Sequence, residues 1–334
     1  MTLEQIAKKM CAAGKGILAA DESTGTMDKR LKTVGIESTE KNRLHFRETL
    51  FTSDSMKNYI GGVILFDETI KQKISTGISV PEIIEKNNSV VGIKVDKGAK
   101  KLAGSSDETV TEGLDGLRER LSEYYKLGAR FTKWRGVYNI GNKYPSIQSI
   151  KANAHALARY AMLVQEADMV PIVEPEVLMD GDHDIDKCYK VTTDVLNECF
   201  NELSIQKVSL KGIVLKPNMI LPGSKNSNKI TTEEIAQKTF DCLKKNVPNE
   251  VPGIAFLSGG QTEEEATKNL NAINKINDTN FLITFSYGRA LQQSALKAWS
   301  KEMSNTKKIH EVFNHRSKMN SEASKGTWSQ SLEV

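Results

Sequence analysis

The stretch GIVLKPNM, residues 212–219, has the pattern of a buried strand that runs into a turn, with one exception. Lys216 places an ammonium group where the pattern predicts another aliphatic side chain. Seven further apolar runs recur along the chain, and each closes on polar residues or glycine. They start at Gly16, Gly61, Val90, Ala129, Val170, Gly253 and Phe281.

The spacing of these runs predicts the fold class. Successive starts lie roughly 30–45 residues apart, which is enough for a strand, a helix and two loops. Strands that alternate with helices indicate a parallel sheet. Eight of them indicate an α/β fold of the (β/α)8 TIM-barrel type, although the number of runs alone leaves an open doubly wound sheet as an alternative.

Helix signals fill the intervals between the runs. Gly128 follows a helical face and is expected to end that helix. Two threonines, each with a glutamate three residues later, fit capping boxes. The face comprises Leu114, Leu117, Leu121 and Tyr124, and the boxes pair Thr231 with Glu234 and Thr262 with Glu265.

Length and composition indicate a globular chain of 334 residues, with 39% hydrophobic and 26% charged residues. We expect one barrel domain over residues 1–317 and a flexible, polar C-terminal tail over residues 318–334. The net charge of +4 slightly favours anionic small molecules. Because the basic residues are spread along the chain, we expect no nucleic-acid partner.

Cysteine usage and hydropathy bear on the compartment. The four cysteines, Cys11, Cys188, Cys199 and Cys242, have no C-x-x-C spacing and suit a reducing environment. No apolar run approaches the roughly 20 residues that span a bilayer, and the N-terminus lacks the apolar stretch of a signal peptide. We therefore expect a cytoplasmic protein that does not enter the membrane.

Charged residues lie inside or at the ends of several predicted strands. Side chains at i and i+2 share a strand face, so the charges of neighbouring runs would point into one volume at the carboxyl end of a barrel. Burying unpaired charges there costs several kcal/mol at least, so the chain must pair them or use them. These residues are Asp21, Lys94, Lys133, Arg135, Glu174, Glu176 and Lys216.

Lys216 suits Schiff-base chemistry. A free lysine has a pKa near 10.4 and attacks a carbonyl only after losing its proton, which apolar walls and a neighbouring cation such as Lys133 favour. The iminium that follows is an electron sink, so an adjacent carbon–carbon bond can break. Asp21 and Glu174 are candidates for the carboxylate that moves protons.

Two glycine loops follow the seventh and eighth runs, the usual phosphate position in such barrels. SGGQTEEE (258–265) precedes a predicted capped helix, and SYGRAL (286–291) adds an arginine whose fork suits phosphate. The candidate phosphate residues are Ser258, Gly259, Ser286, Gly288 and Arg289.

With these residues assembled, the sequence closely resembles class I fructose-1,6-bisphosphate aldolase. The matching stretches follow the family's order over about residues 3–300. They are GKGILAADESTGT, GGVILFDET, KVDKG, FTKWRGV, PIVEPEVL, DGDHD, GIVLKPNM, FLSGGQTEEEA and SYGRALQ. The resemblance implies a TIM barrel, usually a homotetramer, that reversibly cleaves fructose 1,6-bisphosphate to dihydroxyacetone phosphate and glyceraldehyde 3-phosphate without a metal or other cofactor.

The resemblance also implies roles for individual residues. Lys216 would form the Schiff base, Glu174 would move protons with Glu176 beside it, and Asp21 and Lys133 would assist carbinolamine formation and carbon–carbon cleavage. Lys94 would belong to the polar lining. One phosphate would bind Ser258, Gly259, Gly288 and Arg289, and the other end of the substrate would bind Ser23 and Arg30, with Arg135 near the sugar. The family's usual C-terminal tyrosine is absent from the sequence Gln-Ser-Leu-Glu-Val, so we expect proton exchange at bound dihydroxyacetone phosphate to be slow or to use another group.

Other functions remain open at this point. Another lysine-dependent barrel lyase or a transaldolase would share the nucleophile, whereas a metal-dependent aldolase is disfavoured because the histidines have no ligand spacing. A scaffold role is the alternative outside enzymes, since barrels of this family can bind actin or adhesin tails. The stretch DGDHDID (180–186) resembles a calcium loop but lacks its glycine and glutamate, so we interpret it as an acidic helix start.

Overall fold

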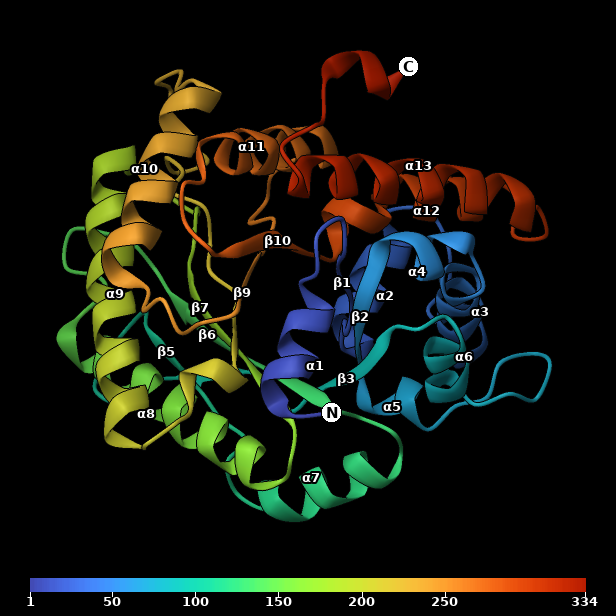
Figure 1. Ribbon diagram of the computed structural model, residues 1–334, viewed down its shortest axis with the longest axis horizontal. Coiled ribbons are helices and arrows are strands. Elements are labelled where there is room, and N and C mark those ends of the chain that lie inside the picture. Colours follow the sequence, from blue (N-terminus) through green and yellow to red (C-terminus); the bar gives the residue numbers. More distant parts are fainter.

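The computed structural model describes residues 1–334 and contains a closed barrel of eight parallel strands (Figure 1). This confirms the predicted TIM barrel and excludes the open sheet, and every predicted apolar run contributes one strand. The strands are β1 (Gly16–Ala20), β2 (Ile60–Leu65), β3 (Val90–Lys94), β6 (Phe131–Tyr138), β7 (Val170–Val177), β8 (Val214–Leu215), β9 (Gly253–Phe256) and β10 (Leu282–Tyr287).

Helices surround the barrel, and a small antiparallel pair, β4 (Ala99–Lys101) with β5 (Thr109–Thr111), lies outside it. None of the helices combines the length and apolar character that a bilayer crossing requires. The helices are α1 (Leu3–Met10), α2 (Thr24–Lys32), α3 (Glu40–Phe51), α4 (Asp54–Tyr59), α5 (Asp67–Ile70), α6 (Val80–Lys86), α7 (Leu117–Lys126), α8 (Ile147–Glu166), α9 (Ile185–Ile205), η1 (Leu210–Gly212), α10 (Thr232–Asn246), α11 (Glu263–Ile276), α12 (Arg289–Lys301), α13 (Thr306–Ser324) and η2 (Gln330–Glu333).

The barrel order is β1-β10-β9-β8-β7-β6-β3-β2. Strand β8 is the shortest, and it ends just before Lys216 and Pro217. The Lys216 N–H still donates to the Val173 carbonyl at 2.8 Å, and the Pro217 carbonyl accepts from the Leu257 N–H at 3.1 Å. Neighbouring strands therefore fix the backbone on both sides of this lysine.

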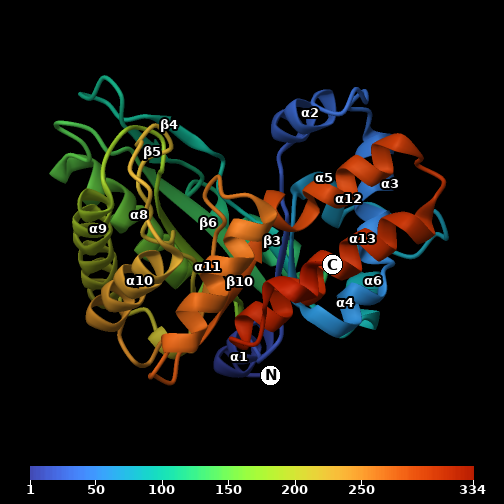
Figure 2. The same ribbon diagram turned by 90° about the horizontal axis from the view of Figure 1, so that it is seen from above.

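The barrel interior is apolar at its amino end. Phe131, Ile172 and Val214 are fully buried there and belong to a cluster that includes residues of α1. Gly92 is required beside Phe131, because a Cβ at position 92 would clash with the Phe131 ring. Helix α1 covers this end, whereas α2 and the β4–β5 pair lie at the opposite end (Figure 2).

A larger apolar cluster joins the outer face of the barrel to the helices. Trp134 belongs to it and stacks on Tyr160 of α8 at 5.4 Å between ring centroids, on the strand face opposite to that of its neighbour Lys133. Cys188 and Cys199 are buried in this cluster as small core residues.

The helix starts follow the sequence signals with two differences. Thr262 and Glu265 form the complete predicted capping box, whereas Thr231 accepts from the Glu234 N–H without the reciprocal bond. Helix α7 begins at Leu117, so Leu114 precedes the helix and packs against the core from the loop. Asp184 caps α9, which confirms the acidic helix start in the DGDHDID stretch.

The predicted domain boundary at residue 318 falls within α13, which continues to Ser324. Beyond this helix, Trp328 is buried, and its indole N–H donates to Glu333 at 2.9 Å. Glu333 also accepts from Arg316 of α13. The division at residue 317 and the flexibility of residues 318–334 stay predictions.

Candidate active site

A cavity of about 540 Å³ opens at the carboxyl end of the barrel. All the candidate site residues predicted from the sequence line this one cavity. They are Asp21, Ser23, Arg30, Lys94, Lys133, Arg135, Glu174, Glu176, Lys216, Ser258, Gly259, Ser286, Gly288 and Arg289. The charges at the ends of the strands therefore share one volume, as their positions in the sequence predicted.

Strand alternation explains why charged side chains lie so close to the apolar cluster at the amino end of the barrel interior. On β6, Lys133 comes two residues after Phe131, and on β7, Glu174 comes two residues after Ile172. Side chains two apart share a strand face, so each charge stands directly above a core residue. The charged layer consequently lies on the floor of the cavity, and its charges must satisfy one another.

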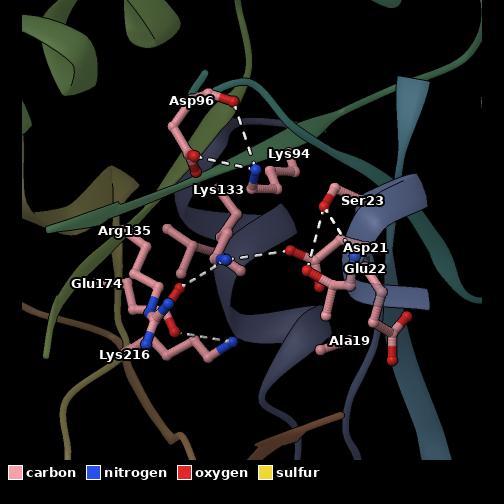
Figure 3. Close-up of polar contacts among 12 residues, drawn as sticks. Ala19, Asp21, Glu22, Ser23, Lys94, Asp96, Lys133, Arg135, Glu174 and Lys216 are labelled. Atoms are coloured by element: carbon pink, nitrogen blue, oxygen red, sulfur yellow. Dashed lines mark hydrogen bonds and ion pairs between the residues drawn. The ribbon is translucent and has the colours of Figure 1, made fainter. Parts of the chain in front are cut away.

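Lys133 is the centre of this charged layer (Figure 3). Its Nζ lies 3.0 Å from Asp21 Oδ2 and 3.1 Å from Glu174 Oε2. Burial alone would lower the pKa of Lys133, but the two carboxylates outweigh burial and raise it. For Asp21, burial opposes ionisation, and Lys133 and Lys216 more than offset it, which lowers the Asp21 pKa to about 2. Lys133 is therefore a fixed ammonium ion, and Asp21 is a fixed carboxylate.

Lys216 lies on the other side of Glu174. Its Nζ is 3.3 Å from Glu174 Oε1, and no other acidic side chain forms an ion pair with it. The side chains of both residues are 4% exposed. Glu174 thus bridges two amines, one of which, Lys133, has a second carboxylate partner.

Further ion pairs surround this centre. Glu176 accepts from Arg135 Nε, and the side chain of Arg135 remains 42% exposed at the rim. On β3, Lys94 Nζ lies 3.0 Å from Asp96 Oδ1, while Asp96 Oδ2 is buried without a hydrogen-bond partner. Lys94 lines the cavity, and its part in the reaction stays a prediction.

The loop after β9 has the backbone shape of an anion site. Gly259 and Gly260 have φ values of 49° and 81°, which favour glycine, and their N–H groups donate to no backbone carbonyl. Thr262 and Glu265 cap the following helix α11 reciprocally, so the Thr262 and Glu265 N–H groups already have acceptors. Gly259 and Gly260 line the cavity, so the glycine turn before α11 offers free N–H groups to an anion there.

The loop after β10 leads directly into helix α12. Gly288 is the N-cap of this helix and provides no side-chain cap, so its first N–H groups remain available to a ligand. Ser286 is buried, and its hydroxyl has no partner. With Arg289 at the first helical position, this loop offers both dipole and charge to an anion.

Another part of the cavity wall is formed by α2, which follows β1, the barrel neighbour of β10. Ser23 is its N-cap and accepts from the Thr26 N–H at 3.4 Å. Arg30, further along the same helix, donates through NH1 to Glu22, while its Nε and NH2 groups are buried without partners. Unused guanidinium donors of this kind are suited to a phosphate.

The cavity has several lining residues that the sequence analysis did not single out. The two charged ones, Glu22 and Asp96, follow β1 and β3 as the predicted charges do, so the same strand-end signal could have found them. Ala19, Val137, Leu257 and the short polar or glycine positions carry no such signal. The complete additional set is Ala19, Glu22, Thr26, Asp96, Gly98, Ala99, Val137, Leu257 and Gly260.

Comparison with known proteins identifies the family. A family model described as fructose-bisphosphate aldolase class-I matches residues 2–334. The chain belongs to the class I fructose-bisphosphate aldolase family. It is 52% identical to a probable fructose-bisphosphate aldolase class 1 of Xanthomonas campestris, over 98% of this chain and 99% of that one. It is 53% identical to cytoplasmic isozyme 1 of Pisum sativum, over 96% of this chain and 90% of that one.

Solved structures agree with this assignment. The fructose-bisphosphate aldolase of Plasmodium falciparum, in a ternary complex with TRAP and a small-molecule inhibitor, superposes with a TM-score of 0.96 at 45% identity. The match covers 98% of this chain and 95% of that one. This class I aldolase is thus an aldehyde-lyase that reversibly cleaves fructose 1,6-bisphosphate to dihydroxyacetone phosphate and glyceraldehyde 3-phosphate. Family membership decides against the transaldolase and metal-dependent alternatives.

Proposed function

We propose that Lys216 is the amine that forms the Schiff base with the ketose. The observation that carries this assignment is the different environment of the two buried lysines. Lys133 lies between Asp21 and Glu174 and stays protonated, so it cannot attack a carbonyl. Lys216 has Glu174 as its single carboxylate partner and can pass it a proton at 3.3 Å.

Glu174 is the proton carrier of the reaction. It lies within reach of both amines, so it can accept the proton of Lys216 and later return one to the carbinolamine hydroxyl, which leaves as water. Glu176, two residues further along β7, stands beside it and is neutralised by Arg135. The iminium then withdraws electrons from the adjacent carbon–carbon bond.

Asp21 and Lys133 assist the bond-breaking step. The Asp21 carboxylate is ionised, so it can accept the hydroxyl proton that must leave as the carbon–carbon bond breaks. Lys133 supplies a fixed positive charge next to both carboxylates and stabilises negative charge as it develops. Lys94, held by Asp96, adds a second fixed cation at the cavity wall.

The two phosphates of the substrate bind at two different sets of residues in the cavity. The phosphate nearer the Schiff base binds the free N–H groups of the glycine loops and the arginine of α12. The other phosphate binds the start of α2 and the unused donors of Arg30, with Arg135 near the sugar. The first set comprises Ser258, Gly259, Ser286, Gly288 and Arg289, and the second comprises Ser23 and Arg30.

Borohydride reduction in the presence of fructose 1,6-bisphosphate tests the nucleophile directly. The reduced adduct should map to the peptide that contains Lys216, and omission of borohydride should leave the peptide unmodified. Label on Lys133 or Lys94 would overturn the assignment of roles.

The active assembly is a homotetramer, and the protein works in the cytoplasm. The second statement is supported by the names of relatives, which include a cytoplasmic isozyme of pea and a cytosolic aldolase of Arabidopsis thaliana. Light scattering of the purified protein tests the first, with a mass of about four chains expected. Fractionation of cells tests the second, and enrichment of the protein with membranes would contradict it.

A protein-binding role is the second candidate function. The solved Plasmodium falciparum aldolase is described in complex with TRAP, which supports binding of an adhesin or cytoskeletal tail by this barrel. Pull-down with such a tail should succeed equally with the wild-type chain and with Lys216→Ala, because binding would not use the nucleophile. Absence of binding by both proteins would refute this role.

A further inference from the structure

Glu22 stands in the active-site cavity, and the mechanism gives it no step. It lies between the proposed acid–base residue Asp21 and the proposed phosphate contact Ser23, and its side chain is 11% exposed. A carboxylate inside a cavity that must hold two phosphates opposes their binding by charge repulsion. Its presence there therefore calls for a physical explanation.

The Glu22 carboxylate holds the guanidinium that we assign to the second phosphate. Oε1 accepts from Arg30 NH1 and lies 3.4 Å from Gln292 Nε2. Oε2 has no hydrogen-bond partner and lies 3.8 Å from Arg47 NH2, outside hydrogen-bond reach. The pair with Arg30 is thus the principal contact of this carboxylate.

Arg30 is only partly used in this pair. One of its three guanidinium nitrogens donates to Glu22, while Nε and NH2 are buried without acceptors. A phosphate offers more oxygens and more charge than one carboxylate oxygen, and it can engage the fork bidentately. An arriving phosphate would compete with Glu22 for the same cation.

We propose that Glu22 is a built-in competitor that holds Arg30 while the site is empty, gives it up to the substrate phosphate, and takes it back on release. The inference rests on the proposed phosphate role of Arg30. Glu22 is a positioning residue that lowers affinity for the phosphate at this side of the cavity.

The variant Glu22→Gln tests the sign of this effect. Glutamine keeps the size and an acceptor oxygen but removes the charge. The KM for fructose 1,6-bisphosphate should fall by about threefold to tenfold, because the substrate phosphate would no longer compete with a carboxylate for Arg30. The KM for fructose 1-phosphate, which has no phosphate for Arg30, should change less than about twofold, a difference within the usual spread of surface charge effects. A higher or unchanged KM for the bisphosphate would mean that Glu22 merely supports Arg30, and would overturn the proposal.

The variant Arg30→Gln separates this proposal from the proposed function. It should raise the KM for fructose 1,6-bisphosphate relative to fructose 1-phosphate. If it does not, the phosphate assignment of Arg30 fails. If it does, and Glu22→Gln added to Arg30→Gln still lowers the KM as much as in the wild type, the competition between Glu22 and Arg30 is refuted.

Two further variants show whether the change in KM depends on the charge of Glu22. Glu68 pairs with Arg43 outside the cavity, and like Glu22 it lies near Arg47, at 4.0 Å from NH1. Glu68→Gln therefore removes a carboxylate near the same arginine without changing a residue of the cavity. Its KM should equal that of the wild type, and a fall like that of Glu22→Gln would overturn the proposal. Glu22→Asp keeps the charge and should not lower the KM.

Discussion

The two ends of the barrel interior are built by the same strands and have opposite chemistry. At the amino end, Phe131 and Ile172 are fully buried among apolar side chains under helix α1. Two residues further along the same strands, Lys133 and Glu174 form an ion pair on the floor of the cavity. The change from hydrocarbon to charge takes place within one repeat of the strand.

This difference shows how the fold supports a buried charged site. The apolar end keeps the strands in register through close packing, for which Gly92 leaves room beside the Phe131 ring. The charged end would be costly on its own, but its lysines and carboxylates satisfy one another on backbones that the apolar end already fixes. Substitutions at the two ends should therefore damage different properties of the enzyme.

The largest effect is expected from Lys216→Ala. Without the amine no Schiff base forms, so kcat should fall by about 10⁴-fold or more, as it does when other covalent nucleophiles are removed. The unfolding transition should remain cooperative, because the lost side chain is charged and lies above the apolar core. Steady-state kinetics measures kcat, and urea denaturation measures the cooperativity of unfolding. Residual turnover within a factor of ten of wild type would refute the assignment of Lys216 as the nucleophile.

The next effect is expected at the apolar end, from Phe131→Ala. Removing this fully buried ring should lower the free energy of unfolding by about 3–5 kcal/mol, while the folded enzyme keeps most of its activity at low temperature. Urea denaturation measures the loss. In the double variant with Gly92→Ala, the new methyl group occupies part of the space left by the ring, so the double variant should lose less stability than the sum of the single ones.

A smaller effect is expected from Glu174→Gln at the charged end. Glutamine keeps the shape but cannot accept and return a proton, so kcat should fall by about 10²–10⁴-fold, the usual range for a general acid–base residue. Lys133 keeps Asp21 as a partner, so the fold should persist. Glu176→Gln is the matched control on the same strand, and an equal loss there would contradict the assignment of Glu174 as the proton carrier.

The smallest effect concerns acid stability. The pKa of Asp21 is lowered from 3.8 to about 2 in the folded protein, so its ionised form contributes stability above pH 4. This contribution is lost as the pH falls from about 4 to about 2, and it amounts to about 2 kcal/mol. The variant Asp21→Asn should lack this part of the acid sensitivity. The free energy of unfolding of both proteins is measured by urea denaturation between pH 2 and pH 4. The same dependence on pH in both proteins would contradict the pairing of Asp21 with Lys133.

Much of the fold followed from local pattern. The apolar runs predicted all eight barrel strands, and alternation placed Lys133 inward because this direction depends on strand geometry alone. No signal in the sequence indicates α13 beyond residue 318, because that part of the helix is polar and the contacts of the buried Trp328 are with residues distant in the sequence.

The site could be predicted as a set of residues, but its pairings could not. The carboxyl-end rule brought Asp21, Glu174 and Lys216 together without any distances. It could not say that Glu174 lies between two lysines, nor that Glu22 occupies Arg30. Such pairings depend on side-chain direction across different strands, which one sequence does not encode locally.

The shortness of β8 has a consequence for protein design. The strand has only two residues, so the backbone around Lys216 is held mainly by neighbouring segments. The Lys216 N–H donates to the Val173 carbonyl, and the Leu257 N–H donates to the Pro217 carbonyl. Transplanting the reactive amine into an unrelated scaffold would therefore require importing the flanking backbones as a unit. A lone grafted lysine would lack the backbone hydrogen bonds that fix the direction of its side chain.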